Sequence, residues 1–134
     1  MDTDRLVKSA LEVRRFAYVP YSNFSVGAAL LTKSGQIFVG CNVENVSLGL
    51  TICAEQGALA AAIASGDVDF VALAVISDSS EPIVPCGRCR QLFAEFSPRL
   101  QVVSSTIHGQ RQLFALDELL PRPRQGIMES TRDV

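Results

Sequence analysis

The stretch CAEQGALAAAIASGDVDFVALAVIS, residues 53–77, decides the fold class. Residues 53–65 are small and apolar on almost every side, which predicts a helix buried on most of its faces and ended by Gly66. Residues 70–77 form a continuous apolar run, typical of a strand that is covered on both sides. A buried helix followed directly by a buried strand indicates an α/β domain.

The rest of the chain continues this alternation. The pattern predicts an amphipathic helix over 2–16, a β-hairpin over 24–31 and 36–40, an ordered loop over 42–51, a second buried helix over 86–96, strands over 101–107 and 112–116, and a helical turn in 116–121. We therefore expect a single three-layer domain over residues 1–134, ending in a polar, loosely held tail over 122–134.

Composition narrows the choice of partners. Twelve basic and fourteen acidic residues give a net charge of −2 without a basic stripe, which argues against a nucleic-acid partner. No apolar run approaches ~18 residues and the N-terminus has no apolar signal region, so we expect no membrane association. In a chain of this kind, expected in the reducing cytoplasm, four cysteines favour metal ligands, reactive thiols or core residues over disulfides.

Three of the four cysteines lie in two short motifs, TICAEQ at 51–56 and PCGRCRQ at 85–91. Each motif lies where a helix is predicted to begin, and a helix N-terminus lowers the pKa of a nearby thiol. Cys86 and Cys89 are three positions apart, so their sulfurs share the first turn of one helix, and Cys53 comes from the other helix start. Three protein ligands with one open position are typical of a catalytic zinc site.

Glu55 follows Cys53 by two positions and is expected beside the metal without binding it. A carboxylate there can accept a proton from a metal-activated water and pass it to a substrate. The combination of CAE with a later PCxxC is the known signature of the zinc deaminases, with a glutamate that does not ligate the metal.

Over nearly all of residues 10–121 the chain resembles the small, homotetrameric, zinc-dependent cytidine deaminases. The likeness begins in YVPYSNFSVGAALL (18–31), continues through GCNVENVS (40–47) and both cysteine motifs, and reaches ELLP (118–121). The resemblance implies a three-layer α/β/α fold with a mixed five-stranded sheet, one Zn²⁺ per chain and a homotetramer. It also implies hydrolysis of cytidine and deoxycytidine to uridine and deoxyuridine with release of ammonia.

The resemblance also assigns roles to individual residues. It implies Cys53, Cys86 and Cys89 as the zinc ligands and Glu55 as the proton shuttle. The residues expected to bind the nucleoside are Phe24, Asn42, Glu44 and Ala54. Asn42 and Glu44 match residues that hold the ribose hydroxyls, which suits an amide that donates and accepts beside a carboxylate that accepts.

The chain departs from the family pattern at three places. Gln56 stands where an arginine commonly compensates the charge of the zinc thiolates; it can still donate a hydrogen bond to a sulfur, although it brings no charge. Gln56 and Arg90, with Arg88 as a further helper, are therefore expected to share this compensation. Leu48 replaces a common tyrosine, and the segment after ELLP lacks an aromatic residue. Arg124 falls near that place, where it either stacks on the pyrimidine or plays no part. These departures leave open a related substrate such as the antibiotic nucleoside blasticidin S.

Other interpretations of the same residues remain. Cys86 and Cys89 also suit a thiol oxidoreductase, which would need neither Cys53 nor Glu55. A zinc-stabilised binding module would fill all four metal positions. Cys41 is expected to be a core thiol, and His108 an exposed turn residue without a role.

Overall fold

The computed structural model contains one sheet with the strand order β2-β1-β3-β4-β5. β1 (Val26–Thr32) pairs antiparallel with both β2 (Ile37–Cys41) and β3 (Phe70–Ser77). β4 (Gln101–Thr106) pairs parallel with β3 and antiparallel with β5 (Arg111–Ala115). The mixed five-stranded sheet expected from the resemblance is therefore confirmed.

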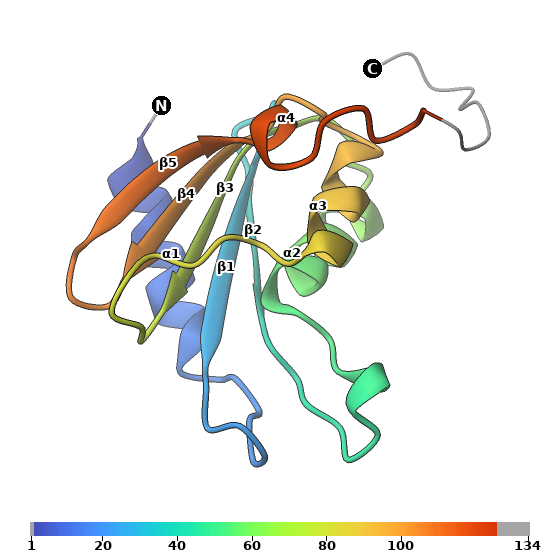
Figure 1. The fold of residues 1–134 in the computed structure, drawn as a ribbon. Helices are drawn as coiled ribbons and strands as arrows, with labels where there is room; N and C mark the ends of the chain where they lie inside the picture. Colours follow the sequence, from blue (N-terminus) through green and yellow to red (C-terminus); the bar gives the residue numbers. More distant parts are fainter. Residues whose placement is uncertain (1, 126–134) are drawn as a thin grey trace.

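Helices cover both faces of this sheet (Figure 1). α1 (Thr3–Arg14) packs on one face, and α2 (Ala54–Ala64) and α3 (Gly87–Ala94) lie on the other. Two short helices complete the fold, η1 (Leu48–Leu50) before α2 and α4 (Leu116–Leu119) after β5. These three layers confirm the expected α/β/α architecture.

The structure describes residues 2–125. Residues 126–134, which make up most of the predicted polar tail, lie outside the described residues. The described segment after α4 runs past α3 (Figure 1).

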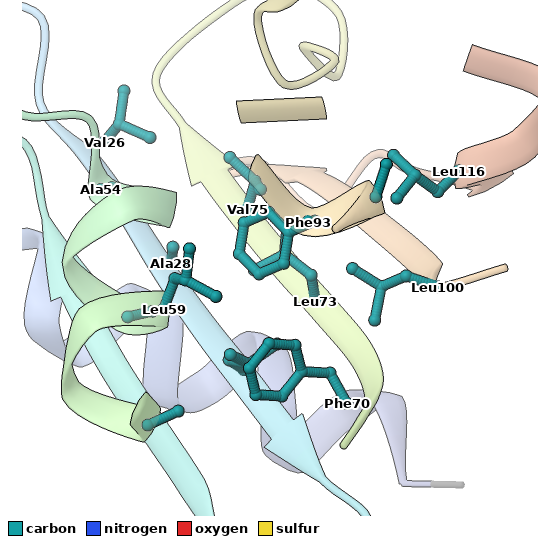
Figure 2. Close-up of a cluster of buried hydrophobic side chains, with 14 residues drawn as sticks. Val26, Ala28, Ala54, Leu59, Phe70, Leu73, Val75, Phe93, Leu100 and Leu116 are labelled. Atoms are coloured by element: carbon teal, nitrogen blue, oxygen red, sulfur yellow. The ribbon is translucent and has the colours of Figure 1, made fainter. Parts of the chain in front are cut away.

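Each face of the sheet has its own hydrophobic core. Figure 2 shows the larger core, to which Phe93 of α3 and Phe70 of β3 both belong. The two rings meet edge to face, with 6.2 Å between their centroids. On the opposite face, Leu6 and Ala10 of α1 pack against small residues of β1 and β3. Burial of these side chains holds the helices on the sheet, since removing apolar surface from water is the main stabilising contribution to folding.

A close contact between two glycines sets the position of α2. A Cβ atom added at Gly40 of β2 would lie 2.3 Å from the Ala54 carbonyl oxygen, and one added at Gly57 of α2 would lie 3.4 Å from the Gly40 Cα atom. The start of α2 therefore lies directly on β2, closer than any residue with a side chain would allow. Since Cys53 and Glu55 belong to this helix start, the contact fixes where they stand.

The helix and strand limits differ from the sequence prediction by small amounts. The strand over 70–77 is confirmed, while the predicted helices over 53–65 and 86–96 begin one residue later because Cys53 and Cys86 have extended backbones and serve as N-caps. The last strand is shifted by one residue, to Arg111–Ala115.

Candidate metal centre

Three cysteine sulfurs meet where α2 and α3 begin. Cys53 is the N-cap of α2, Cys86 is the N-cap of α3, and Cys89 lies buried in the first turn of α3. Their Sγ atoms all lie within 4.8 Å of one another. Thiolates bound at about 2.3 Å to one tetrahedral zinc ion stand about 3.8 Å apart, so this cluster fits zinc.

Neither N-cap thiol accepts a hydrogen bond from the N–H groups of its own helix, so the hydrogen bonds of the sulfurs are with one another. Contacts with the thiols of Cys89 and Cys86, with a smaller contribution from the Arg88 charge, lower the pKa of Cys53 to about 6. The thiol of Cys89, which donates to Cys53, has a raised pKa.

Glu55 lies beside this cluster in the first turn of α2. Its side chain is 5% exposed, and burial raises its pKa to about 7, with the Cys53 charge adding to the effect. Burial of a charged carboxyl group is costly unless it is hydrogen-bonded, and here the Cys89 thiol and the backbone N–H of Glu55 itself are its partners. Its position agrees with the expectation that it stands next to the metal ligands.

The chain leading out of β2 lies beside the start of α2. Val43 pairs with Ile52 through two backbone hydrogen bonds of 2.9 and 2.8 Å, and it also pairs with Tyr18. Since Ile52 directly precedes Cys53, these contacts bring Asn42 and Glu44, the neighbours of Val43, close to the start of α2. The structure thus gathers the predicted sugar-binding residues near the predicted zinc ligands.

Asn42 and Glu44 already hold the loop over 18–26. The Asn42 amide accepts from the Val26 N–H (2.9 Å) and donates to the Phe24 carbonyl (2.8 Å). One Glu44 oxygen accepts from the N–H groups of Tyr21 and Ser22, and the other from the Ser22 hydroxyl. Hydrogen bonds from Ser22 lower the pKa of Glu44. Each side chain keeps further donor or acceptor capacity for a ligand.

Phe24 and Ala54 differ in exposure. The Phe24 side chain is 37% exposed, whereas Ala54 is completely buried against β2. Phe24 is thus available to line a pocket, whereas Ala54 has no exposed surface, so the expected contact between its backbone and a ligand stays a prediction. Ser22, which the sequence analysis did not select, is part of this site through Glu44; its place in the turn YSN was the signal for it.

The residues expected to compensate the thiolate charge have other contacts. Arg90 donates through Nε to the Pro85 carbonyl (2.7 Å) and through Nη1 to the Leu119 carbonyl (3.0 Å). The Gln56 Oε1 atom is buried without a hydrogen-bond partner. Compensation by these two residues therefore stays a prediction.

The remaining candidates lie away from the metal centre. Cys41 is opposite Gly27 in the β1–β2 pair, so it points to the α1 face, whereas the cysteine cluster lies on the other face. His108 is exposed as expected, but it also lies 3.3 Å from Asp78.

A cavity of about 630 Å³ lies at the far end of α3 and is lined in part by Lys33, Phe96 and Arg99. None of the predicted site residues lines it.

Comparison with known proteins agrees with this site. Residues 1–105 match the model of the cytidine and deoxycytidylate deaminase zinc-binding region. A cytidine deaminase from Halalkalibacterium halodurans is 48% identical over 122 residues, covering 90% of this chain and 92% of that protein.

Solved structures give the same result. A cytidine deaminase from Burkholderia pseudomallei superposes with a TM-score of 0.88 at 46% identity, covering 91% of this chain and 98% of that one. The cytidine deaminase from Mycobacterium tuberculosis superposes with a TM-score of 0.78 at 39% identity, covering 91% and 96%. The fold and the cysteine cluster thus define a zinc-dependent deaminase. The chain belongs to the cytidine and deoxycytidylate deaminase zinc-binding family.

Proposed function

We propose that the protein hydrolyses cytidine and deoxycytidine to uridine and deoxyuridine with release of ammonia. The observation that carries this function is the cluster of three sulfurs within 4.8 Å of one another, with the buried Glu55 beside it. Cys53, Cys86 and Cys89 would hold one Zn²⁺, which when bound supplies Lewis acidity toward a water molecule.

Glu55 moves the protons of the reaction. The water oxygen forms a bond to C4 of the pyrimidine, and the bond from C4 to the amino nitrogen breaks. Of the two water protons, Glu55 delivers one to N3 and the other to the departing amine, which leaves as ammonia. The burial of this carboxyl group beside the proposed metal ligands supports both transfers.

Recognition of the sugar is assigned to the loops beside the zinc ligands. Asn42 retains one N–H and Glu44 retains lone pairs for the ribose hydroxyls, and Phe24 offers an apolar wall. The backbone of Ala54 contacts the pyrimidine ring. The sequence has no cluster of basic residues that could line a channel for a nucleic-acid strand, which favours a nucleoside over a polynucleotide as the substrate.

Exposed apolar surface supports assembly into a homotetramer. Val46, Leu48 and Leu50 are 78%, 72% and 66% exposed in a single chain, and the outer side of α2 exposes Ile63. Large apolar side chains left exposed in a single chain support burial against a neighbouring subunit. Within residues 2–125, no helix has the length and hydrophobicity needed to cross a bilayer. Our assignment of the protein to the cytoplasm rests on the free state of its four cysteines, which suits a reducing compartment.

Turnover of a substrate panel by the zinc-loaded protein tests this function. We expect ammonia release with cytidine and deoxycytidine and weaker or no release with cytosine, CMP and blasticidin S. Zinc analysis should give one ion per chain, and light scattering should give the mass of four chains. Inactivity toward both nucleosides in zinc-loaded protein would overturn the assignment.

A further inference from the structure

The loop between α1 and β1 and the loop after β2 project from the same end of the sheet (Figure 1). Backbone hydrogen bonds join them, since the Tyr18 N–H donates to the Asn42 carbonyl (2.9 Å) and the Glu44 N–H donates to the Tyr18 carbonyl (2.9 Å). These bonds place the two backbones side by side but do not orient the Glu44 side chain. The direction of this carboxylate, which the proposed function assigns to the sugar, depends on further contacts.

Ser22 supplies contacts to both oxygens of the Glu44 carboxylate. Its N–H donates to one oxygen (3.1 Å), and its hydroxyl donates to the other. The Tyr21 N–H adds a bond of 3.0 Å to the first oxygen. Because both oxygens are held, the plane of the carboxylate is fixed as well as its position.

The Ser22 hydroxyl also contacts Phe24. Its oxygen accepts a hydrogen bond from the Phe24 N–H (3.0 Å). The hydrogen bond from the Ser22 side chain is the main cause that lowers the pKa of Glu44, so the carboxylate is ionised at neutral pH. An ionised carboxylate only accepts hydrogen bonds, and the single hydroxyl proton of Ser22 therefore points to Glu44. One hydroxyl thus joins two residues proposed to bind the nucleoside.

The backbone of Phe24 is held on both sides. Its N–H donates to Ser22, and its carbonyl accepts from the Asn42 amide (2.8 Å). Asn23 has a positive φ of 57°, which asparagine adopts more readily than most residues. This turn brings the Ser22 hydroxyl within reach of Phe24 along the chain and of Glu44 across the two loops.

We propose that Ser22 is a positioning residue for nucleoside binding, which holds the Glu44 carboxylate and the Phe24 backbone in the arrangement that receives the sugar. The inference rests on the proposed function and extends it to a residue that acts through Glu44. An exposed glutamate ordinarily loses rotamer freedom when it binds a ligand. Hydrogen bonds from Tyr21 and Ser22 order Glu44 beforehand, which removes this cost at binding. Loss of the hydroxyl should therefore weaken substrate binding more than the chemical step.

Steady-state kinetics of Ser22→Ala with cytidine test the proposal. The variant keeps the backbone N–H donors and loses only the hydroxyl. We expect KM to rise about tenfold, as for loss of a hydrogen bond to a charged group, with kcat within about twofold of wild type. Ser22→Thr keeps the hydroxyl and should stay within about threefold of wild type in KM. Ser65→Ala, which changes an exposed serine at the other end of α2, is the matched control and should leave both constants unchanged.

A double-mutant cycle shows whether Ser22 acts through Glu44. In a Glu44→Ala background, adding Ser22→Ala should raise KM by less than about threefold, because the interaction that the two residues share is already lost. A further rise of about tenfold in that background, as expected for independent residues, would overturn the proposal. An unchanged KM in Ser22→Ala, a fall in kcat alone, or an equal loss in Ser22→Thr would also overturn it. Zinc-loaded wild-type protein that fails to turn over cytidine and deoxycytidine would instead contradict the proposed function.

Discussion

The metal centre and the loops beside it are built in opposite ways. The zinc ligands and Glu55 stand on the starts of two helices that pack on the sheet, and the backbone of α2 touches β2 at Gly40. Asn42, Glu44 and Phe24 stand on loops whose shape depends on side-chain hydrogen bonds and whose apolar residues are largely exposed. The groups proposed to react are thus held by packing, and the groups proposed to bind the sugar by a polar network of side chains.

The largest expected effect lies within the metal centre. Glu55→Ala should lower kcat by roughly 10²–10⁴-fold, the contribution of general acid–base catalysis, while zinc content and thermal stability stay near wild type. Steady-state kinetics with metal analysis measures both. A variant that retains a near-normal rate would remove Glu55 from the mechanism.

A pair of glycine substitutions separates the two regions directly. Gly40→Ala should destabilise the protein by about 1–3 kcal/mol and weaken zinc binding, because the new Cβ would lie 2.3 Å from the Ala54 carbonyl oxygen and displace α2. Gly49→Ala, in the exposed loop, meets no atom within 4 Å and should change the free energy of unfolding by less than about 0.5 kcal/mol. Denaturant unfolding of both variants is the measurement, and equal effects would contradict the distinction.

Substitution in the loops should act on binding more than on chemistry. Glu44→Gln should raise KM for cytidine about tenfold and change kcat less, because it weakens charge-assisted hydrogen bonds worth roughly 1–3 kcal/mol without touching the metal centre. Glu12→Gln on α1 serves as the control for loss of one acidic charge. A fall in kcat with unchanged KM would place Glu44 in the chemical step.

The smallest effect is expected at Arg124. Its guanidinium donates to the Glu95 carbonyl (2.9 Å) at the end of α3 within the same chain. Arg124→Ala should therefore change KM less than about twofold and stability by less than about 1 kcal/mol, as is usual for an exposed hydrogen bond. A large rise in KM would show that the residue stacks on the pyrimidine of a neighbouring subunit instead.

Much of the fold could be predicted because local patterns and tertiary packing agree. The apolar run over 70–77 forms the strand that was expected, and the extended N-cap residues Cys53 and Cys86 explain why both helices start one residue late. The cysteine cluster was also predictable, since helix starts and spacing fix where the sulfurs point.

The contacts of the site residues were not predictable in the same way. Nothing local to Arg90 indicates that it bonds the Leu119 carbonyl, and nothing local to Glu44 indicates Ser22, because these partners are 29 and 22 residues distant in the chain. Side-chain hydrogen bonds between distant loops depend on the completed fold. Sequence patterns therefore located the chemistry better than the interactions that support it.

The contacts of α3 with the end of α4 and the segment after it affect which substitutions the protein can tolerate during evolution. Arg90 and Gln91 of α3 donate to the carbonyl oxygens of Leu119 and Pro123, which are backbone atoms. Substitutions at positions 119 and 123 leave these acceptors in place, so the helix that carries two zinc ligands stays anchored while the neighbouring surface diversifies.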